Sequence, residues 1–194
     1  MDVRKIIIMF ILYSIIGWIG EMIYCYIYDR SFVNRGFLNG PVCPIYGCGA
    51  LFIVFMVKQY QNNILLVFLF GLIGCSVLEY ITSYLMEKVF HAKWWDYSKH
   101  KFNINGRVCL LNSIIFGIGS VIIIYLIQPM VMLFINGFDD LELTILAISL
   151  LVYFVFDYLF SFIITLKYKN IRDKKEEVKD EFLYQYFNNK IIKY

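Results

Sequence analysis

Hydrophobic residues fall into five long runs along the chain, separated by short polar links. The runs cover 6–28, 44–57, 64–86, 109–135 and 143–166. Four of them are long enough to cross a bilayer as a helix. The run at 44–57 would cover only about 21 Å of a hydrocarbon core roughly 30 Å thick. It therefore either begins within the preceding loop at Pro41 or spans half of the membrane.

The composition agrees with this pattern, since 60% of the 194 residues are hydrophobic and 19% are aromatic. A soluble domain of this length could not bury so much apolar surface. The sequence predicts an all-α integral membrane protein with about five transmembrane helices. The first run is too long for a cleavable signal peptide, and Trp18 and Glu21 occupy the place of its cleavage site, so we expect this helix to be retained.

A five-residue block occurs twice, and each copy opens an apolar run. The blocks are Asn39-Gly40-Pro41-Val42-Cys43 and Asn105-Gly106-Arg107-Val108-Cys109. They predict a tandem two-helix repeat followed by a fifth helix. Parallel repeats of this kind usually build one shared site between their two halves. The expected units are repeat one at about 6–57, repeat two at about 64–135, the fifth helix at about 143–166, a transmembrane domain at 1–166 and a polar C-terminal tail at 167–194.

Three carboxylates, Glu21, Glu79 and Asp157, lie inside the odd-numbered runs at similar positions. These helices are expected to run in the same direction, which places the three acids at a similar depth, about 10 Å in from the loop-rich face. An ionised acid in lipid costs roughly 2.5–3.5 kcal/mol on insertion scales, so each should face the protein interior and find a partner or a proton. The pattern favours a polar cavity; the alternative is that the acids fasten the helices together without chemistry.

The polar links supply the remaining candidates. Asn39 and Asn105 are expected to cap the following helices, with Pro41 in a first helical turn, so that free N–H groups point toward the acids. Trp94 and Trp95 are expected to be interfacial anchors, whereas Asp96 and Tyr97 could form a lid. The candidate substrate- or proton-binding residues are Glu21, Glu79, Asp157, Arg107, Asn39, Asn105, Tyr46, Asp96 and Tyr97; the candidate structural loop residues are Gly40, Pro41, Pro44, Gly47, Gly106 and Trp95.

Charge and cysteine usage narrow the partners. Lys and Arg gather in the links after the first and third runs and in the tail, while the opposite side holds only Arg4, Lys5 and Lys58. The positive-inside rule therefore predicts an outside N-terminus and a cytoplasmic C-terminus in a bacterial cell membrane. The basic residues flank spans, so no nucleic-acid partner is expected. The five cysteines lack metal-ligand spacing, so no metal, disulfide or cofactor is expected either.

Several strings resemble a known family. They are RGFLNGPVCPIYG at 35–47, Leu78-Glu79-Tyr80, WWDYS at 94–98 and NINGRVCL at 103–110. Over about residues 6–120 the chain is similar to the CmpB-like family of ABC transporter permeases of type IV. The resemblance implies a polytopic bacterial membrane protein that works as a permease subunit with a separate ATPase.

The sequence leaves three functional hypotheses. The first is a small permease-type transport subunit whose intramembrane carboxylates bind a cationic group or protons. The chain has no Walker A motif, and five helices are few for a whole pathway, so it would need an ATPase partner or a second copy of itself. The second is an intramembrane enzyme acting on a lipid headgroup or prenyl-linked substrate, with paired acids in general acid–base catalysis. The third is a non-catalytic membrane scaffold.

Overall fold

The computed structural model describes residues 2–30, 34 and 36–173, and these form an all-α membrane protein with one small β-hairpin. The elements are α1 (Val3–Asp29), α2 (Pro44–Phe52), α3 (Ile64–Phe90), β1 (Asn103–Ile104), β2 (Val108–Cys109), α4 (Leu110–Ile122), α5 (Gln128–Ile135) and α6 (Asp140–Asp173). A π-helical turn at Ile53–Val57 and a tight turn at Lys58–Tyr60 extend α2, and a second π-helical turn at Ile123–Ile127 joins α4 to α5. Residues 174–194 of the expected tail lie outside the described residues, as does Arg35.

Within the described part of the chain, four helical stretches are long and apolar enough to cross a membrane: Val3–Ile27, Ile64–Phe90, Leu110–Ile135 and Asp140–Asn170. The run at 44–57, which was expected to be too short for a full span, appears as a shorter apolar helix, Pro44–Tyr60. Large apolar side chains point outward from the long helices; Ile73 is 57% exposed and Phe156 is 72% exposed. Such surfaces suit lipid rather than water. The prediction of a multi-pass, all-α membrane protein is confirmed.

The helix boundaries follow local capping chemistry. Asn63 begins α3, because its side-chain oxygen accepts hydrogen bonds from the N–H groups of Leu65 and Leu66. Both α1 and α3 are 27 residues long and end at a left-handed residue with φ of 53°, Arg30 and His91 respectively. In each case the backbone N–H of that residue donates to the carbonyl four positions earlier, which closes the last turn.

The expected caps at the two repeated blocks are wrong. The helices begin three or more residues later, after Cys43 and Cys109, and neither N-cap residue makes a side-chain capping bond. Asn39 and Asn105 therefore lie in the loops. Pro44 occupies the first helical turn expected for Pro41, because proline has no N–H to lose at that position.

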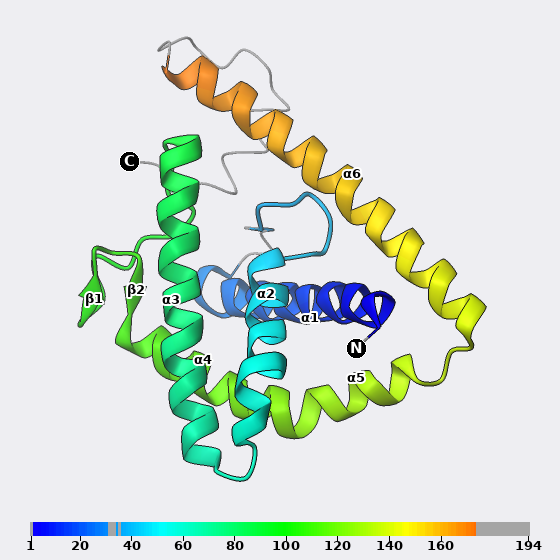
Figure 1. The fold of residues 1–194 in the computed structure, drawn as a ribbon. Coiled ribbons are helices and arrows are strands. Elements are labelled where there is room, and N and C mark those ends of the chain that lie inside the picture. Colours follow the sequence, from blue (N-terminus) through cyan, green and yellow to red (C-terminus); the bar gives the residue numbers. More distant parts are fainter. Residues whose placement is uncertain (1, 31–33, 35, 174–194) are drawn as a thin grey trace.

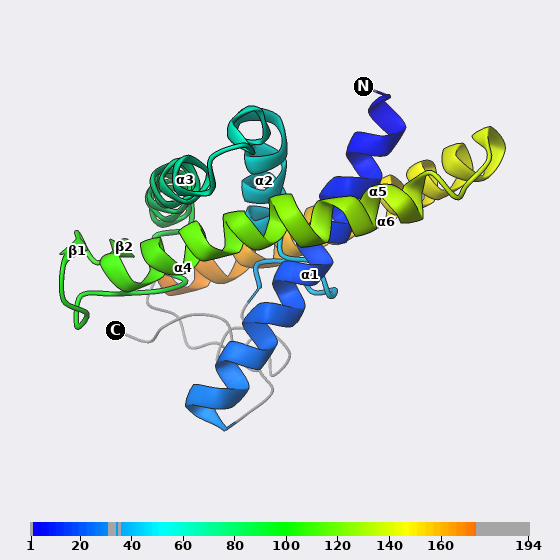
Figure 2. The same ribbon diagram turned by 90° about the horizontal axis from the view of Figure 1, so that it is seen from below.

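The helices cross one another steeply instead of forming a parallel bundle (Figures 1 and 2). The helices α2 and α3 run side by side and α1 crosses them, while α4 packs against α3 in the most extensive of the helix contacts and continues into α5. The expectation that the odd-numbered helices share one direction is therefore wrong for α1 and α3. A close crossing is possible because a Cβ added at Gly17 would lie 2.2 Å from Tyr46 Cβ, so glycine lets α1 approach α2.

Buried apolar residues gather where α1, α2, α5 and α6 meet. This core contains Ile8, Met9, Tyr13, Ala50, Val54, Val131, Ile135, Leu143 and Ala147. The Tyr13 hydroxyl donates a hydrogen bond to the Gln128 side chain within it, so the buried phenol is satisfied. A second apolar cluster, centred on Phe90, Ala92 and Trp94, packs the link after α3 against α6. These two contacts fix the elements that carry the candidate site.

Candidate functional site

Glu21 and Glu79 lie in one polar cluster together with two tyrosines, Tyr46 and Tyr97. The Tyr46 hydroxyl donates to Glu21 Oε2 at 2.7 Å, and the Tyr97 hydroxyl donates to Glu79 Oε1 at 3.1 Å. Tyr97 lies within electrostatic reach of both acids, because Glu79 and Glu21 each contribute to raising the pKa of its phenol. We call these four residues the acid–tyrosine cluster. It joins α1, α2, α3 and the link 91–109.

Glu79 is the most enclosed member of the acid–tyrosine cluster. Its side chain is only 6% exposed, and it belongs to a buried stripe of α3 with four-residue spacing that also contains Gly71, Cys75 and Ser83. The Asn112 side chain of α4 is near enough to interact with the carboxylate. Among the residues that the structure describes, however, Glu79 Oε2 has no hydrogen-bond partner. A buried carboxylate oxygen left without a partner is costly and calls for a proton or a ligand.

Tyr97 reaches Glu79 from outside the helices. Burial raises the pKa of the Tyr97 phenol well above its ordinary value, and the nearby Glu79 carboxylate raises it further. The phenol therefore stays protonated and acts as a hydrogen-bond donor. The backbone N–H of Tyr97 donates to the Gly106 carbonyl at 2.8 Å, which fixes the position of the ring within the link.

Asp157, the third expected acid, binds backbone instead. Its Oδ1 and Oδ2 accept hydrogen bonds from the N–H groups of Asn39 at 3.1 Å and Gly40 at 2.9 Å. The Ser161 hydroxyl supports the same contact from the next turn of α6. Within the described residues no hydrogen bond or ion pair joins Asp157 to Glu21 or Glu79. Its observed contacts hold the first repeated block against α6.

Arg107 pairs with an acid that the sequence analysis missed. Its Nη2 lies 2.6 Å from Glu87 Oε2, and its Nη1 donates to Ser83 Oγ at 3.2 Å. The guanidinium also lies over the rings of Tyr80 and Tyr84, at 5.8 and 5.5 Å from their centroids. Glu87 lay just beyond the run 64–86, although its spacing of eight residues from Glu79 placed it on the same helical face. The cation is therefore bound to this acid in the structure.

The link 91–109 folds around its own polar residues. Asp96 accepts hydrogen bonds from the N–H and hydroxyl of Ser98, and these bonds lower the pKa of the Asp96 carboxyl. Asn105 and Gly106 turn the hairpin with φ of 55° and 68°, and the Asn105 amide donates to the Tyr80 hydroxyl at 2.8 Å. The Trp95 indole N–H donates to the Arg107 carbonyl at 3.0 Å. The link is a folded unit that carries Tyr97.

Trp94, expected to be an interfacial anchor, is buried inside the protein instead. Its side chain is 7% exposed and packs beside Phe37 and Phe90, so the ring belongs to the protein interior. The reason is the close packing of α6 on this link, which supplies apolar partners that the sequence pattern did not reveal. The link therefore presents other residues to its surroundings.

Two of the four candidate structural residues in and just after the first block, Gly40 and Gly47, permit close contacts. A Cβ at Gly40 would lie 1.9 Å from the Tyr153 hydroxyl oxygen, and one at Gly47 would lie 2.2 Å from Ser14 Oγ. Pro44 starts α2, whereas Pro41 is exposed in the loop. The glycines thus let the loop and α2 press onto α6 and α1.

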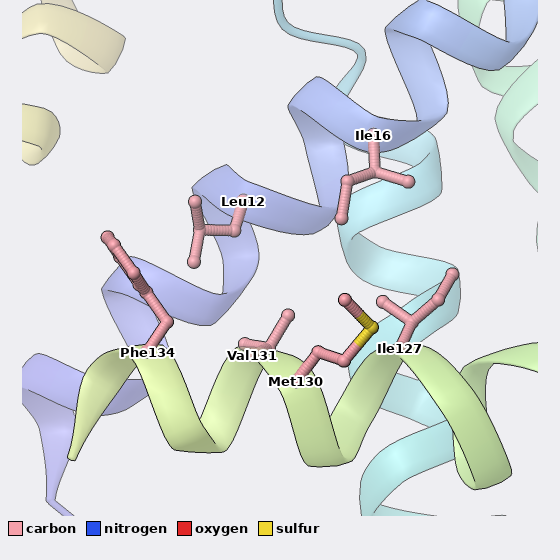
Figure 3. Close-up of a pocket in the computed structure, with 6 residues that line it drawn as sticks. All are labelled: Leu12, Ile16, Ile127, Met130, Val131 and Phe134. Carbon is pink, nitrogen blue, oxygen red and sulfur yellow. The ribbon is translucent and has the colours of Figure 1, made fainter. Parts of the chain in front are cut away.

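Figure 3 shows a groove whose lining includes none of the three acids. It has a volume of about 330 Å³ and lies between α1 and the segment from the second π-helical turn through α5. Its lining residues are Leu12, Ile16, Ile127, Met130, Val131 and Phe134. All six are apolar, so the groove differs in chemistry from the acid–tyrosine cluster. No group of three or more His, Cys, Asp or Glu suited to a metal ion occurs among the described residues.

Comparison with known families identifies the relationship that the motifs indicated. The family model described as "Putative ABC-transporter type IV" matches residues 8–162, from within α1 to within α6. Both repeated blocks and all four residues of the acid–tyrosine cluster lie within the match. No curated protein and no solved structure matches the chain.

Proposed function

The chain belongs to the family described as "Putative ABC-transporter type IV", and from this premise we propose that it is a permease-type transport subunit of a bacterial cell membrane. Its transport site is the acid–tyrosine cluster, which binds a cationic group or a proton. Because the sequence carries no Walker A motif, a separate ATPase supplies the energy. The transmembrane domain, 1–166, carries the site, and the tail beyond it lies in the cytoplasm.

The observation that carries the proposal is the state of Glu79. This carboxylate is buried, receives one phenol hydrogen bond and has an oxygen that no described residue satisfies. An acid whose only role was to fasten helices would have its oxygens satisfied by the protein. The second acid, Glu21, adds another carboxyl group within electrostatic reach of Tyr97. A cation or proton is the species that this arrangement stabilises.

The two-helix repeat explains why the acids come in a pair. Each half consists of a long acid-bearing helix, a polar loop with the Asn-Gly-x-Val-Cys block and an apolar helix after the cysteine. Tyr46 and Asn112 each stand three residues after that cysteine, and each lies next to the acid of its own half. The repeat thus builds one site between its halves. A second copy of the chain would complete a transport pathway.

The partner and the transport site can be tested together. We expect a tagged chain isolated from native membranes in mild detergent to bring an ATPase subunit with it. In a deletion strain, the wild-type gene should restore a solute profile, measured by mass spectrometry, that Glu79→Gln fails to restore. Glu142→Gln is the matched control, because Glu142 is exposed in the first turn of α6 and a glutamine oxygen can still accept the hydrogen bond from the Asp139 N–H. Full restoration by Glu79→Gln would show that the acid–tyrosine cluster is not the transport site. Failure to isolate an ATPase with the chain would contradict the role as a permease subunit.

A further inference from the structure

The outer end of the link 91–109 exposes apolar side chains among positive charges. Phe102 is 78% exposed and Ile104 is 59% exposed. Lys99 and Lys101 precede them and are also exposed. We call residues 99–104, which lead into and include strand β1, the hairpin tip; the turn that follows is formed by Asn105 and Gly106. Two solvent-facing apolar side chains beside lysines resemble the composition of segments that lie in a membrane interface.

The hairpin tip is held rigidly. The Asn103 amide donates to the carbonyls of Ser98 at 3.3 Å and His100 at 2.8 Å, while its oxygen accepts from the Gly106 N–H at 3.0 Å. Phe102 has a φ of 52°, a left-handed conformation that is unfavourable for a bulky residue. The surrounding hydrogen bonds maintain it, and the result is an aromatic ring directed outward. Strain of this kind persists where the rest of the structure fixes it and often marks a functional segment.

Phe102 lies next to the start of a helix that is long and apolar enough to cross the membrane. The N–H of Leu110, the first residue of the α4 span, donates to the Phe102 carbonyl at 3.2 Å. Phe102 therefore lies beside the residue at which the chain begins to cross the membrane. Leu110 and Leu111 are exposed as well, at 46% and 54%, so apolar surface continues from the tip onto the helix.

The positive charge of the hairpin tip favours binding to an anionic surface. Lys99 and Lys101 stand on the tip, and the nearest acid in the link, Asp96, is engaged with Ser98 and with the charges of Lys93 and Lys99. We propose that the hairpin tip docks on anionic lipid, with Phe102 and Ile104 in the boundary between headgroups and acyl chains and the two lysines on the phosphates. This surface shares no residue with the acid–tyrosine cluster, although the same link carries Tyr97. A peripheral protein subunit is the competing occupant.

A photoreactive benzoylphenylalanine in place of Phe102 tests the docking directly. In native membranes we expect the peptide containing position 102 to gain the mass of a lipid. In nanodiscs, anionic phosphatidylglycerol should give a several-fold higher yield of this adduct than phosphatidylcholine. A covalent adduct to a protein subunit instead of lipid would overturn the proposal, as would equal yields in the two lipids.

Charge reversal separates docking from folding. Each lysine should contribute about fivefold to binding of an anionic surface, so the double variant Lys99→Glu, Lys101→Glu should reduce the adduct in phosphatidylglycerol by about tenfold or more. Lys58→Glu, at an exposed lysine in the turn between α2 and α3, is the matched control and should leave the yield unchanged. The unfolding temperature of each variant in detergent should match the wild type. A normal yield from the correctly folded double variant would contradict the docking.

Discussion

The two Asn-Gly blocks share a sequence pattern but are held in different ways. The first is held from outside, because Asp157 of α6 accepts the backbone N–H groups of Asn39 and Gly40. The second is held from within its own half, through the left-handed turn at Asn105 and Gly106. A similar motif therefore gives one loop that depends on a fifth helix and one that folds as a unit. The difference shows that a short motif does not determine its own backbone conformation.

The acids of the two halves, Glu21 and Glu79, also differ in how far they are enclosed and in which segment donates a hydrogen bond to them. Glu21 is partly exposed and receives a hydrogen bond from Tyr46, which belongs to the following helix. Glu79 is buried and receives its bond from Tyr97, which belongs to the loop before the following helix. The second half thus encloses its acid more completely and leaves one oxygen without a partner among the described residues. Binding of a ligand or proton should depend more strongly on the second half.

The largest expected effect comes from adding a methyl group where α1 and α2 are in close contact. Gly17→Ala would place a methyl group 2.2 Å from Tyr46 Cβ, so the helices must separate. We expect a loss of about 2–3 kcal/mol in the free energy of unfolding, the upper part of the usual cost of overpacking. Gly20→Ala is the matched control, since nothing lies within 4 Å of its added Cβ. Equal unfolding temperatures in detergent for the two variants would show that α1 does not cross α2 at Gly17.

Arg107→Ala should affect the second half alone. It removes the ion pair with Glu87 and the bond to Ser83, which are half-buried, so we expect a loss of about 1.5 kcal/mol. Protease cleavage within the link 91–109 should become faster, while cleavage within the loop 30–43 stays unchanged. Arg107→Lys keeps the charge but loses the two-point geometry and should recover part of the stability. Faster cleavage in both loops would contradict separate anchoring.

Removing the phenol hydroxyls one at a time compares the acids directly. Tyr97→Phe and Tyr46→Phe should each cost about 1 kcal/mol of stability, the usual value of a side-chain hydrogen bond. Their functional effects should differ, since Tyr97→Phe leaves Glu79 without its observed hydrogen bond. We expect a larger loss of complementation for Tyr97→Phe in the deletion strain. Equal losses would mean that both halves contribute equally.

The smallest effect concerns acid stability of the link 91–109. The pKa of Asp96 is lowered in the folded protein by hydrogen bonds from Ser98, so its contribution is present above the ordinary value near 4 and disappears as the pH falls through the lower folded-state pKa. Intrinsic amide exchange itself slows in acid, so the quantity to follow is the protection factor of the link, which corrects for this; we expect it to fall in acid. Asp96→Asn should remove most of this acid-dependent loss of protection, measured by hydrogen exchange with mass spectrometry. An unchanged acid dependence in Asp96→Asn would assign it to another group.

The helical runs were predictable because apolar length is a local property. The run 64–86 became α3 at Ile64–Phe90, and the run 109–135 became the stretch Leu110–Ile135 despite its π-helical turn. The steep crossing of α1 and α3 was not predictable, since it depends on contacts such as Gly17 with Tyr46 between distant segments. The caps failed for a related reason: Asn39 and Asn105 have the right side chains but lie too early in the chain.

The sequence identified the residues of the candidate site but not the partners to which each residue binds. The structure brings Glu21, Glu79, Tyr46 and Tyr97 together, and all four were among the candidate binding residues. The contact of Asp157 with backbone N–H groups was hidden, because it depends on the conformation of the first loop. Glu87 was missed because it follows the apolar run, yet it is the partner of Arg107.

The central claim is that Glu21 and Glu79 act in one cluster, and carbodiimide labelling tests it most directly. The apolar reagent dicyclohexylcarbodiimide modifies protonated carboxyl groups, and mass spectrometry of the peptide containing Glu79 gives the rate. If the two acids share one site, removing the neighbouring carboxyl group in Glu21→Gln should change the rate of Glu79 labelling several-fold. Asp157→Asn should leave the rate at the wild-type value. The claim is contradicted if Glu79 labels at one rate in all three proteins, or if Asp157→Asn has the larger effect.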